Sequence, residues 1–237
     1  TMVFRIHDHP NPEKLQGLSV FAKKFCYDIK LQDESKISTA LNQLSTDVEG
    51  KPEQNVLQSL AIRCMAKAIY TTKQSSHYGL AFEYYTHFTS PIRRYPDVMV
   101  HRLLAHYLAD GSSANTEHYE KLCVHSSQME KRAADAERAS VKYKQAEYLQ
   151  DNVGKQFEGI ISGVTEWGMY VELVENKCEG MVRLRDISDD FYVLDEKNYC
   201  IIGQRKKRKY QLGDKVTIKV KKVDLSKRQI DFSLVTE

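Results

Sequence analysis

The spacing of apolar residues predicts helices in the first part of the chain. Asn11-Pro12 is a good N-cap and first-turn pair, so we expect a helix from there to about Tyr27. A second helix is predicted from roughly Glu53 to Tyr70. Its apolar residues fall in adjacent pairs every four positions: Val56, Leu57, Leu60, Ala61, Cys64, Met65, Ala68 and Ile69. Such a stripe indicates a core face rather than a cofactor-binding segment.

Three further elements are predicted before residue 150. Aromatic and β-branched residues between Tyr78 and Phe88 favour one or two short strands. Ser90-Pro91 is expected to cap a helix that reaches about Leu108, with Pro96 kinking or restarting it. Residues 116–150 contain neither Gly nor Pro and are rich in Ala, Glu, Lys and Arg, which predicts one long helix or two joined helices.

Proline and glycine indicate a change of architecture near residue 150. All five prolines lie at or before Pro96, whereas seven of the eleven glycines lie at or after Gly154. Beyond Gly154 the pattern alternates, with a curved hairpin expected over 157–173 and a second strand pair over 216–234. We therefore predict an α+β fold with two domains: a mostly helical domain over residues 1–150 and a small five-stranded β-barrel over 151–237.

Several classes of protein conflict with the composition. No apolar run is long enough to cross a bilayer, and the first residues show no signal-peptide pattern. The five cysteines are scattered and form no CxxC pair, which argues against a disulfide framework or a structural zinc site and favours a reducing cytoplasm. His101 and His106 are five residues apart, with no acid at the position that a zinc protease motif requires. Because the chain begins at Thr1, we expect it to be a fragment.

Positive charge is concentrated near the end of the chain. The net charge is only +3, yet residues 203–228 carry eleven Lys and Arg against Asp214 and Asp224. A local excess of this kind favours binding of a polyanion.

The segment HFTSPIRRYPD, residues 87–97, holds a second candidate for anion binding. With Ser90 as N-cap and Pro91 in the first turn, free backbone amides would point out of a helix end, next to Arg93 and Arg94. Because arginine is mildly unfavourable at a helix start, two of them suggest a phosphate ligand. The alternative is that one of these arginines pairs with Asp97 on a surface turn and nothing binds.

Residues 78–102, which contain HFTSPIRRYPD and VHR, resemble the signature of the RNB catalytic domain of the ribonuclease II/ribonuclease R family. GMVRLRDI, residues 180–187, resembles the ribonuclease R branch of that family. This resemblance implies processive hydrolysis of RNA from its 3′ end to nucleoside 5′-monophosphates. It also implies Mg²⁺ held by clustered aspartates, which we expect upstream of residue 1, so that the fragment alone would be inactive. The implied catalytic residues are Arg93, Arg94 and Glu137. The alternative for Glu137 is a solvated helix charge.

Residues 154–234 resemble the S1 motif, an RNA-binding module with an OB fold. The resemblance implies that Trp167 and Tyr170 stack on bases and that Arg183 replaces a histidine common at that position. The alternative is that Trp167 caps the barrel and Tyr170 belongs to its core. The other expected RNA-binding residues are basic: Arg185, Arg205, Lys206, Lys207, Arg208 and Lys221.

Two hypotheses remain for the function, and both involve single-stranded RNA. The first is the RNA-guiding part of a 3′-to-5′ exoribonuclease. The second is a non-catalytic RNA-binding adaptor built from the same domains. An unrelated helical scaffold with a generic OB fold conflicts with the SPIRRYPD run. Half a domain would expose apolar surface, so we also expect the fragment to dimerise.

Overall fold

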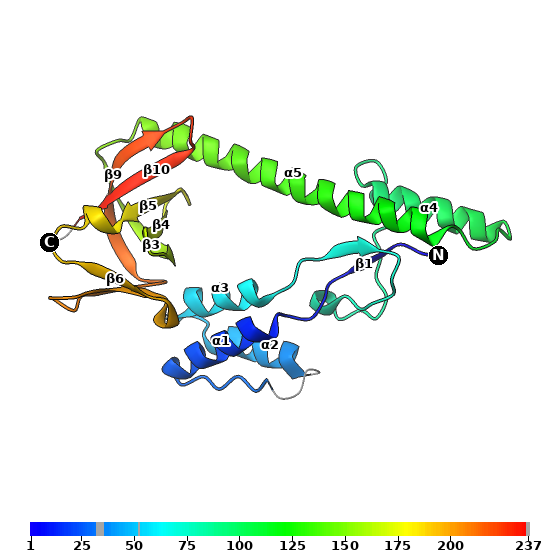
Figure 1. Ribbon diagram of the computed structural model, residues 1–237, viewed down its shortest axis with the longest axis horizontal. Coiled ribbons are helices and arrows are strands. Elements are labelled where there is room, and N and C mark those ends of the chain that lie inside the picture. Colours follow the sequence, from blue (N-terminus) through cyan, green and yellow to red (C-terminus); the bar gives the residue numbers. More distant parts are fainter. Residues whose placement is uncertain (32–35, 52, 236–237) are drawn as a thin grey trace. The chain divides into compact units, whose positions relative to one another are not determined.

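The structure is a computed structural model that describes residues 1–31, 36–51 and 53–235 (Figure 1). The chain divides into two compact units. The first unit consists of Thr1–Gly17 and Ala61–Ala136, and the second unit consists of Leu18–Leu60 and Glu137–Glu237. Three helices contribute residues to both units: α1 (Pro12–Ala22), α3 (Gln54–Cys64) and α5 (Thr116–Gln150).

The first unit combines a short β ladder with two helices. Strand β1 (Phe4–Ile6) pairs antiparallel with β2 (Ile69–Thr71), and α4 (Tyr95–Leu108) precedes α5. The buried apolar cluster of this unit takes three residues from α4, which are Met99, Val100 and Leu103, together with Val3, Tyr70 and Cys123. A turn of 3-10 helix, η3 (Tyr78–Leu80), interrupts the segment between β2 and α4.

The second unit contains a closed barrel of five strands. These are β3 (Gln156–Val164), β4 (Gly168–Leu173), β5 (Glu179–Arg183), β9 (Lys215–Asp224) and β10 (Gln229–Leu234), in the order β10-β5-β4-β3-β9. Only β10 and β5 run parallel. The alternating apolar positions point inward and meet the end of α5, where Ala146 and Leu149 are fully buried. This arrangement confirms the predicted α+β fold with a five-stranded barrel.

A three-stranded sheet is inserted between β5 and β9. It consists of β6 (Tyr192–Asp195), β7 (Cys200–Gly203) and β8 (Lys209–Gln211), with η4 (Leu184–Asp186) before it and η5 (Glu196–Asn198) inside it. The sheet packs on the helical part of the second unit, which comprises the end of α1, η1 (Lys23–Phe25), α2 (Ile37–Asp47) and the start of α3. There, the Phe21 ring meets the Tyr199 ring edge-on, with 5.2 Å between centroids.

Several predicted elements are confirmed. Residues 116–150 form one continuous helix of 35 residues, and α4 ends at Leu108 as expected. The predicted second helix, in contrast, extends too far. Helix α3 ends at Cys64, and Ile69–Thr71 forms a strand instead. The backbone groups of this strand pair with β1, which they could not do within a helix. Helix α2 was not predicted.

The predictions for residues 78–94 were wrong in two places. No strand forms between Tyr78 and Phe88, because His7 accepts the Gly79 amide hydrogen at its Nδ1 atom and curls this segment (3.0 Å). The helix predicted to begin at Ser90 begins at Tyr95 instead. The Ser90 carbonyl accepts the amides of Arg93 and Arg94 in a separate turn, and Pro96 lies in the first turn of α4.

Candidate nucleic-acid interface

Two aromatic side chains face solvent on the hairpin that joins β3 to β4. Trp167 is 72% exposed and Tyr170 is 37% exposed. Strands β4 and β5 approach closely beside this hairpin, since a Cβ atom on Gly168 would lie 2.3 Å from the Val182 carbonyl oxygen. The Thr165 hydroxyl closes the turn by donating to the Gly168 carbonyl (2.9 Å). Neither ring belongs to the barrel core, so both are available to stack on a planar ligand.

Two arginines follow the same edge of the barrel. Arg183 ends β5 and bonds both carboxylate oxygens of Asp231 through its Nη2 atom (3.2 Å each), which holds the guanidinium in one orientation. Arg185 lies in η4 and is exposed. A fixed arginine and an exposed arginine thus lie beside the aromatic hairpin, where they can meet a planar base or a phosphate.

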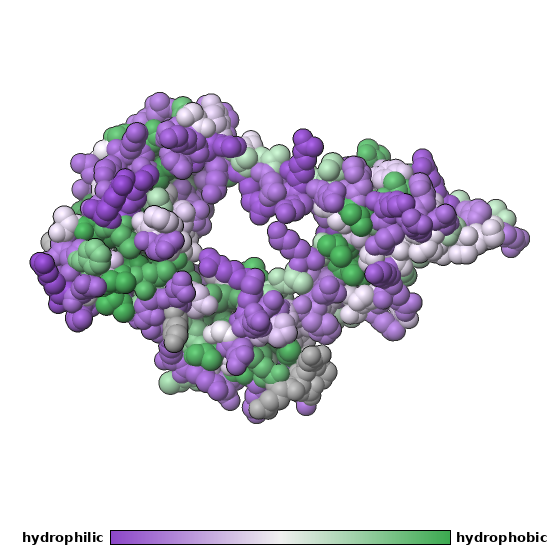
Figure 2. All heavy atoms as spheres, viewed as in Figure 1, coloured by the Kyte–Doolittle hydropathy of each residue, from purple (hydrophilic) through white to green (hydrophobic). Residues whose placement is uncertain are grey.

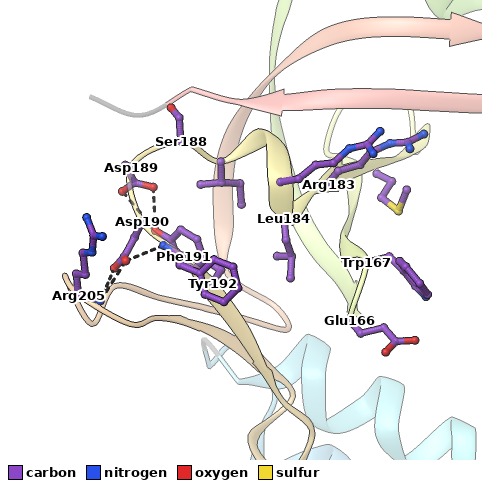
Figure 3. A pocket seen from close by; sticks show the side chains of 13 residues that line it. Glu166, Trp167, Arg183, Leu184, Ser188, Asp189, Asp190, Phe191, Tyr192 and Arg205 are labelled. Carbon is purple, nitrogen blue, oxygen red and sulfur yellow. Dashed lines mark hydrogen bonds between the residues drawn. The ribbon is translucent and has the colours of Figure 1, made fainter.

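A pocket of about 670 Å³ brings these residues together with the inserted sheet (Figure 3). Its walls include Trp167 from the hairpin, Arg183 and Arg185 from the end of β5, and Phe191 and Arg205 from the inserted sheet. The pocket therefore unites four of the residues predicted to bind RNA. Its volume lies in the range of small-molecule sites.

Two of the three acidic residues that line this pocket, Asp189 and Asp190, are held by neighbours within the protein, and the third, Glu166, is exposed. The Asp190 carboxylate accepts the backbone amides of Phe191 (2.7 Å), Arg205 (3.0 Å) and Lys206 (2.6 Å). Partial desolvation raises the pKa of Asp190, but these three hydrogen bonds outweigh it and hold the pKa below its ordinary value. Asp189 accepts the Tyr192 hydroxyl hydrogen (3.2 Å) and lies 3.8 Å from the Lys206 ammonium. Neither carboxylate is left to repel a phosphate at full strength.

The remaining predicted basic residues lie around the pocket. Lys206, Lys207 and Arg208 form the exposed turn between β7 and β8, and Lys207 adopts a left-handed backbone conformation (φ 58°). Lys221 on β9 pairs with Asp186 at 2.9 Å. These residues, like Tyr170, do not line the pocket itself.

Phe191 is a residue of this surface that sequence analysis missed. Its ring is 69% exposed, and it follows the two aspartates directly. The sequence signal for this residue is the aromatic pair Phe191-Tyr192. The sequence does not show which of the two rings is exposed and which is buried, because that depends on the register of β6.

The second candidate site is the turn at Arg93 and Arg94 in the first unit. Arg94 pairs with Asp97, which is fully buried, at 3.0 Å, and Asp97 also accepts the Ser90 amide (2.7 Å). This is the ion pair that was the alternative to phosphate binding. Arg93 is exposed and makes one long hydrogen bond to the Ser90 hydroxyl (3.4 Å), so its guanidinium remains accessible. Arg94 therefore holds the turn together, while Arg93 is free to meet an anion.

Glu137, the third predicted catalytic residue, has an exposed side chain on α5 and belongs to the second unit. Two histidines of the first unit contact neighbouring aromatic rings. The His87 Nδ1 atom lies 2.8 Å from the Tyr70 hydroxyl, and the His101 ring stacks on Phe88 with 4.0 Å between centroids. Burial lowers the pKa of His87, with Arg94 and Arg5 adding to the effect.

Among the described residues, no group of three or more His, Cys, Asp or Glu side chains is placed to hold a metal ion. The described part of the chain therefore does not fit a divalent metal centre of the kind that the resemblance implies. Among the same described residues, no helix has the length and apolarity to cross a bilayer.

Two family models match parts of the chain. Residues 1–110 match the RNB domain, and residues 150–234 match the S1 RNA binding domain. These matches support RNB and S1 domains in this chain. The ribonuclease R of Aquifex aeolicus is 37% identical over 237 residues, which cover 98% of this chain and 33% of that protein. Ribonuclease R 1 of Lactococcus lactis is also 37% identical, over 97% of this chain and 29% of its own length.

Among solved structures, this chain is similar to Mycoplasma genitalium RNase R in complex with ribose methylated single-stranded RNA. The TM-score is 0.88 and the sequence identity 27%, covering 99% of this chain and 38% of that one. The chain therefore spans about a third of the length of the relatives it matches.

Proposed function

We propose that this chain is the RNA-guiding part of a 3′-to-5′ exoribonuclease that degrades single-stranded RNA processively to nucleoside 5′-monophosphates. The observation that carries the proposal is the pocket on the barrel, where an exposed Trp167 lies beside Arg183 and Arg185. An aromatic platform flanked by cations suits a strand with unpaired bases and a charged backbone. The RNA in the Mycoplasma genitalium RNase R complex supports the same ligand class.

Three further proposals concern the whole protein. Arg93 would contact phosphates near the scissile bond, where a guanidinium stabilises developing negative charge, and Glu137 would be a further catalytic residue. Mg²⁺ would be the metal ion, held by residues other than those described. The location would be cytoplasmic, which is supported by five cysteines that are all free thiols.

Incubation of this chain with 5′-labelled single-stranded RNA in the presence of MgCl₂ tests the proposal. Samples from the same tube are run on native and denaturing gels. We expect RNA that is shifted but intact, with weaker binding in 0.2 M than in 0.05 M NaCl. Absence of a shift at 10 µM protein would refute RNA binding. A ladder that shortens from the 3′ end and survives repurification would show that these residues suffice for hydrolysis.

A longer natural form of the protein separates the exoribonuclease from the non-catalytic adaptor. The exoribonuclease requires that the longer form shorten the same RNA with Mg²⁺ and that Arg93→Ala slow this reaction. The adaptor requires binding alone. Self-association of the fragment stays a prediction, and sedimentation equilibrium checks it, since a monomer mass at working concentration would contradict it.

A further inference from the structure

Phe191 presents an apolar ring to solvent from a rigid backbone. Its amide donates to the Asp190 carboxylate (2.7 Å), and its carbonyl accepts the Gln204 amide (2.9 Å), so both sides of the residue are held. The ring nevertheless stays 69% exposed. Apolar residues gather in view around β6, whereas hydrophilic residues cover most of β9 and β10 (Figure 2). A single exposed apolar residue needs no explanation, but this one shares a pocket with Trp167.

The two exposed rings stand on different walls of that pocket. In Figure 3, Trp167 and Phe191 lie on either side of the Leu184 side chain. Trp167 comes from the barrel hairpin and Phe191 from the segment that enters the inserted sheet. A chain of planar groups that crosses the pocket would therefore meet one ring after the other.

The charges around the pocket favour a polyanion over an apolar peptide. Arg183, Arg185 and Arg205 line it, and the Arg205 side chain makes no ion pair or hydrogen bond among the described residues. Two of the three acids that line the pocket are occupied, since Asp190 binds three backbone amides and Asp189 binds Tyr192, which leaves the exposed Glu166 as the remaining carboxylate. Asp190 also fixes the start of the basic turn next to Phe191, which keeps Arg205 at the rim of the pocket.

We propose that this pocket is a two-base subsite for single-stranded RNA, in which Phe191 stacks on the base adjacent to the one that stacks on Trp167. The Arg205 guanidinium contacts the phosphate on the Phe191 side. The proposal rests on the proposed RNA-binding function and extends it to the inserted sheet. It requires unpaired bases, because a duplex offers no free base faces for two separate rings.

The experiment measures binding of this chain to a short single-stranded RNA that carries 2-aminopurine at each position in turn. Stacking on an aromatic ring quenches the fluorescence of this base. The variants are Phe191→Leu, which removes the ring, Phe191→Trp, which keeps one, and Trp167→Leu. The matched control is Tyr148→Leu, which removes an aromatic ring that is 49% exposed on α5 and outside the pocket.

We expect quenching at two adjacent positions in the unchanged chain and its loss at one of them in Phe191→Leu. The affinity of Phe191→Leu should fall about 5- to 150-fold, the loss of one stacked base. The slope of log affinity against log salt should stay unchanged, because no phosphate contact is removed. Phe191→Trp should bind within about threefold of the unchanged chain, and Tyr148→Leu within about twofold.

Two other outcomes overturn the proposal in distinguishable ways. If Trp167→Leu weakens binding while Phe191→Leu binds as the unchanged chain does, the subsite is wrong and RNA binding stands. The Phe191 wall would then suit a protein partner instead. If the unchanged chain binds no RNA at all, the proposed function fails and this subsite fails with it.

Discussion

The barrel and the first unit expose apolar side chains in different ways. The barrel closes its own hydrogen-bond ladder and buries the inward positions of all five strands. The first unit has a small buried cluster and many exposed apolar residues, among them Ile62, Phe82, Tyr84, Ile92 and Leu108. On the barrel side, an exposed aromatic ring therefore indicates a binding site, because Trp167 and Phe191 line the same pocket there. In the first unit, exposure is too common to single out one residue.

The stability of the barrel depends on its centre, and Phe232→Ala should produce the largest effect. Phe232 is fully buried, and its ring fills the space above Gly180, so its removal leaves a cavity. We expect a loss of about 3–5 kcal/mol in the free energy of unfolding of the barrel. Hydrogen exchange resolved by peptide should show faster exchange over residues 156–234 and no change in α4. The exposed Phe191→Ala should alter stability by no more than about 0.5 kcal/mol. Equal protection of the barrel in Phe232→Ala and the unchanged chain would contradict a self-contained barrel core.

The first unit depends instead on single polar contacts, and Asp97→Asn tests this. The substitution removes the charge that pairs with Arg94 at the start of α4 and leaves the guanidinium partly buried. We expect a loss of about 2–3 kcal/mol, below that of a fully buried pair because the Arg94 side chain is 22% exposed. The measurement is hydrogen exchange over residues 90–108, with the barrel peptides as internal reference. Asp110→Asn, at an exposed position with φ 57° that Asn tolerates, is the matched control. Unchanged exchange in Asp97→Asn would mean that the ion pair does not stabilise the turn.

The same contrast explains which features could be predicted from sequence. The barrel strands were predicted because each strand buries one face, so that apolar and polar residues alternate within the same segment of sequence. In β9, Ile218 and Val220 are buried, and Lys219 between them is exposed. The path of residues 78–94 was not predicted, because it depends on a hydrogen bond to His7, which is far away in sequence. The basic residues of the pocket were found as residue types, but Phe191 became visible only with the register of β6. Likewise, the sequence Arg93-Arg94 does not show which of the two arginines is exposed and which forms an ion pair.

A third test concerns the carboxylate that joins α5 to β2. Glu120 accepts hydrogen bonds from the Thr72 amide (2.6 Å) and from the hydroxyls of Thr71 and Thr72. Partial burial raises the pKa of Glu120, but these bonds outweigh it and hold the pKa below its ordinary value of 4.5. Because the folded-state pKa is the lower one, this stabilisation is present above about pH 4.5 and is lost as pH falls through the folded-state pKa.

Glu120→Gln should therefore destabilise the first unit by about 1–2 kcal/mol at pH 7. Urea unfolding of the variant and the unchanged chain should converge as the pH is lowered below 4. Glu117→Gln is the control, because Glu117 forms only an exposed pair with Lys121. A difference between Glu120→Gln and the unchanged chain that stays constant from pH 7 to pH 3 would rule out the carboxylate as its source.

The prediction with the smallest expected effect separates phosphate contacts from base stacking on the barrel side. Lys207 is an exposed cation in the β7–β8 turn, so Lys207→Gln should remove at most one phosphate contact. The slope of log affinity against log salt should then become shallower by about 0.7, with only a few-fold loss of affinity at low salt. Lys215→Gln, an exposed lysine at the start of β9 outside the pocket, should leave the slope unchanged. Phe191→Leu is expected to show the opposite behaviour, a lower affinity with an unchanged slope. If Lys207→Gln and Phe191→Leu changed the salt slope equally, charge alone would account for RNA binding. The exposed rings of the barrel side would then indicate a binding site no better than the exposed rings of the first unit do.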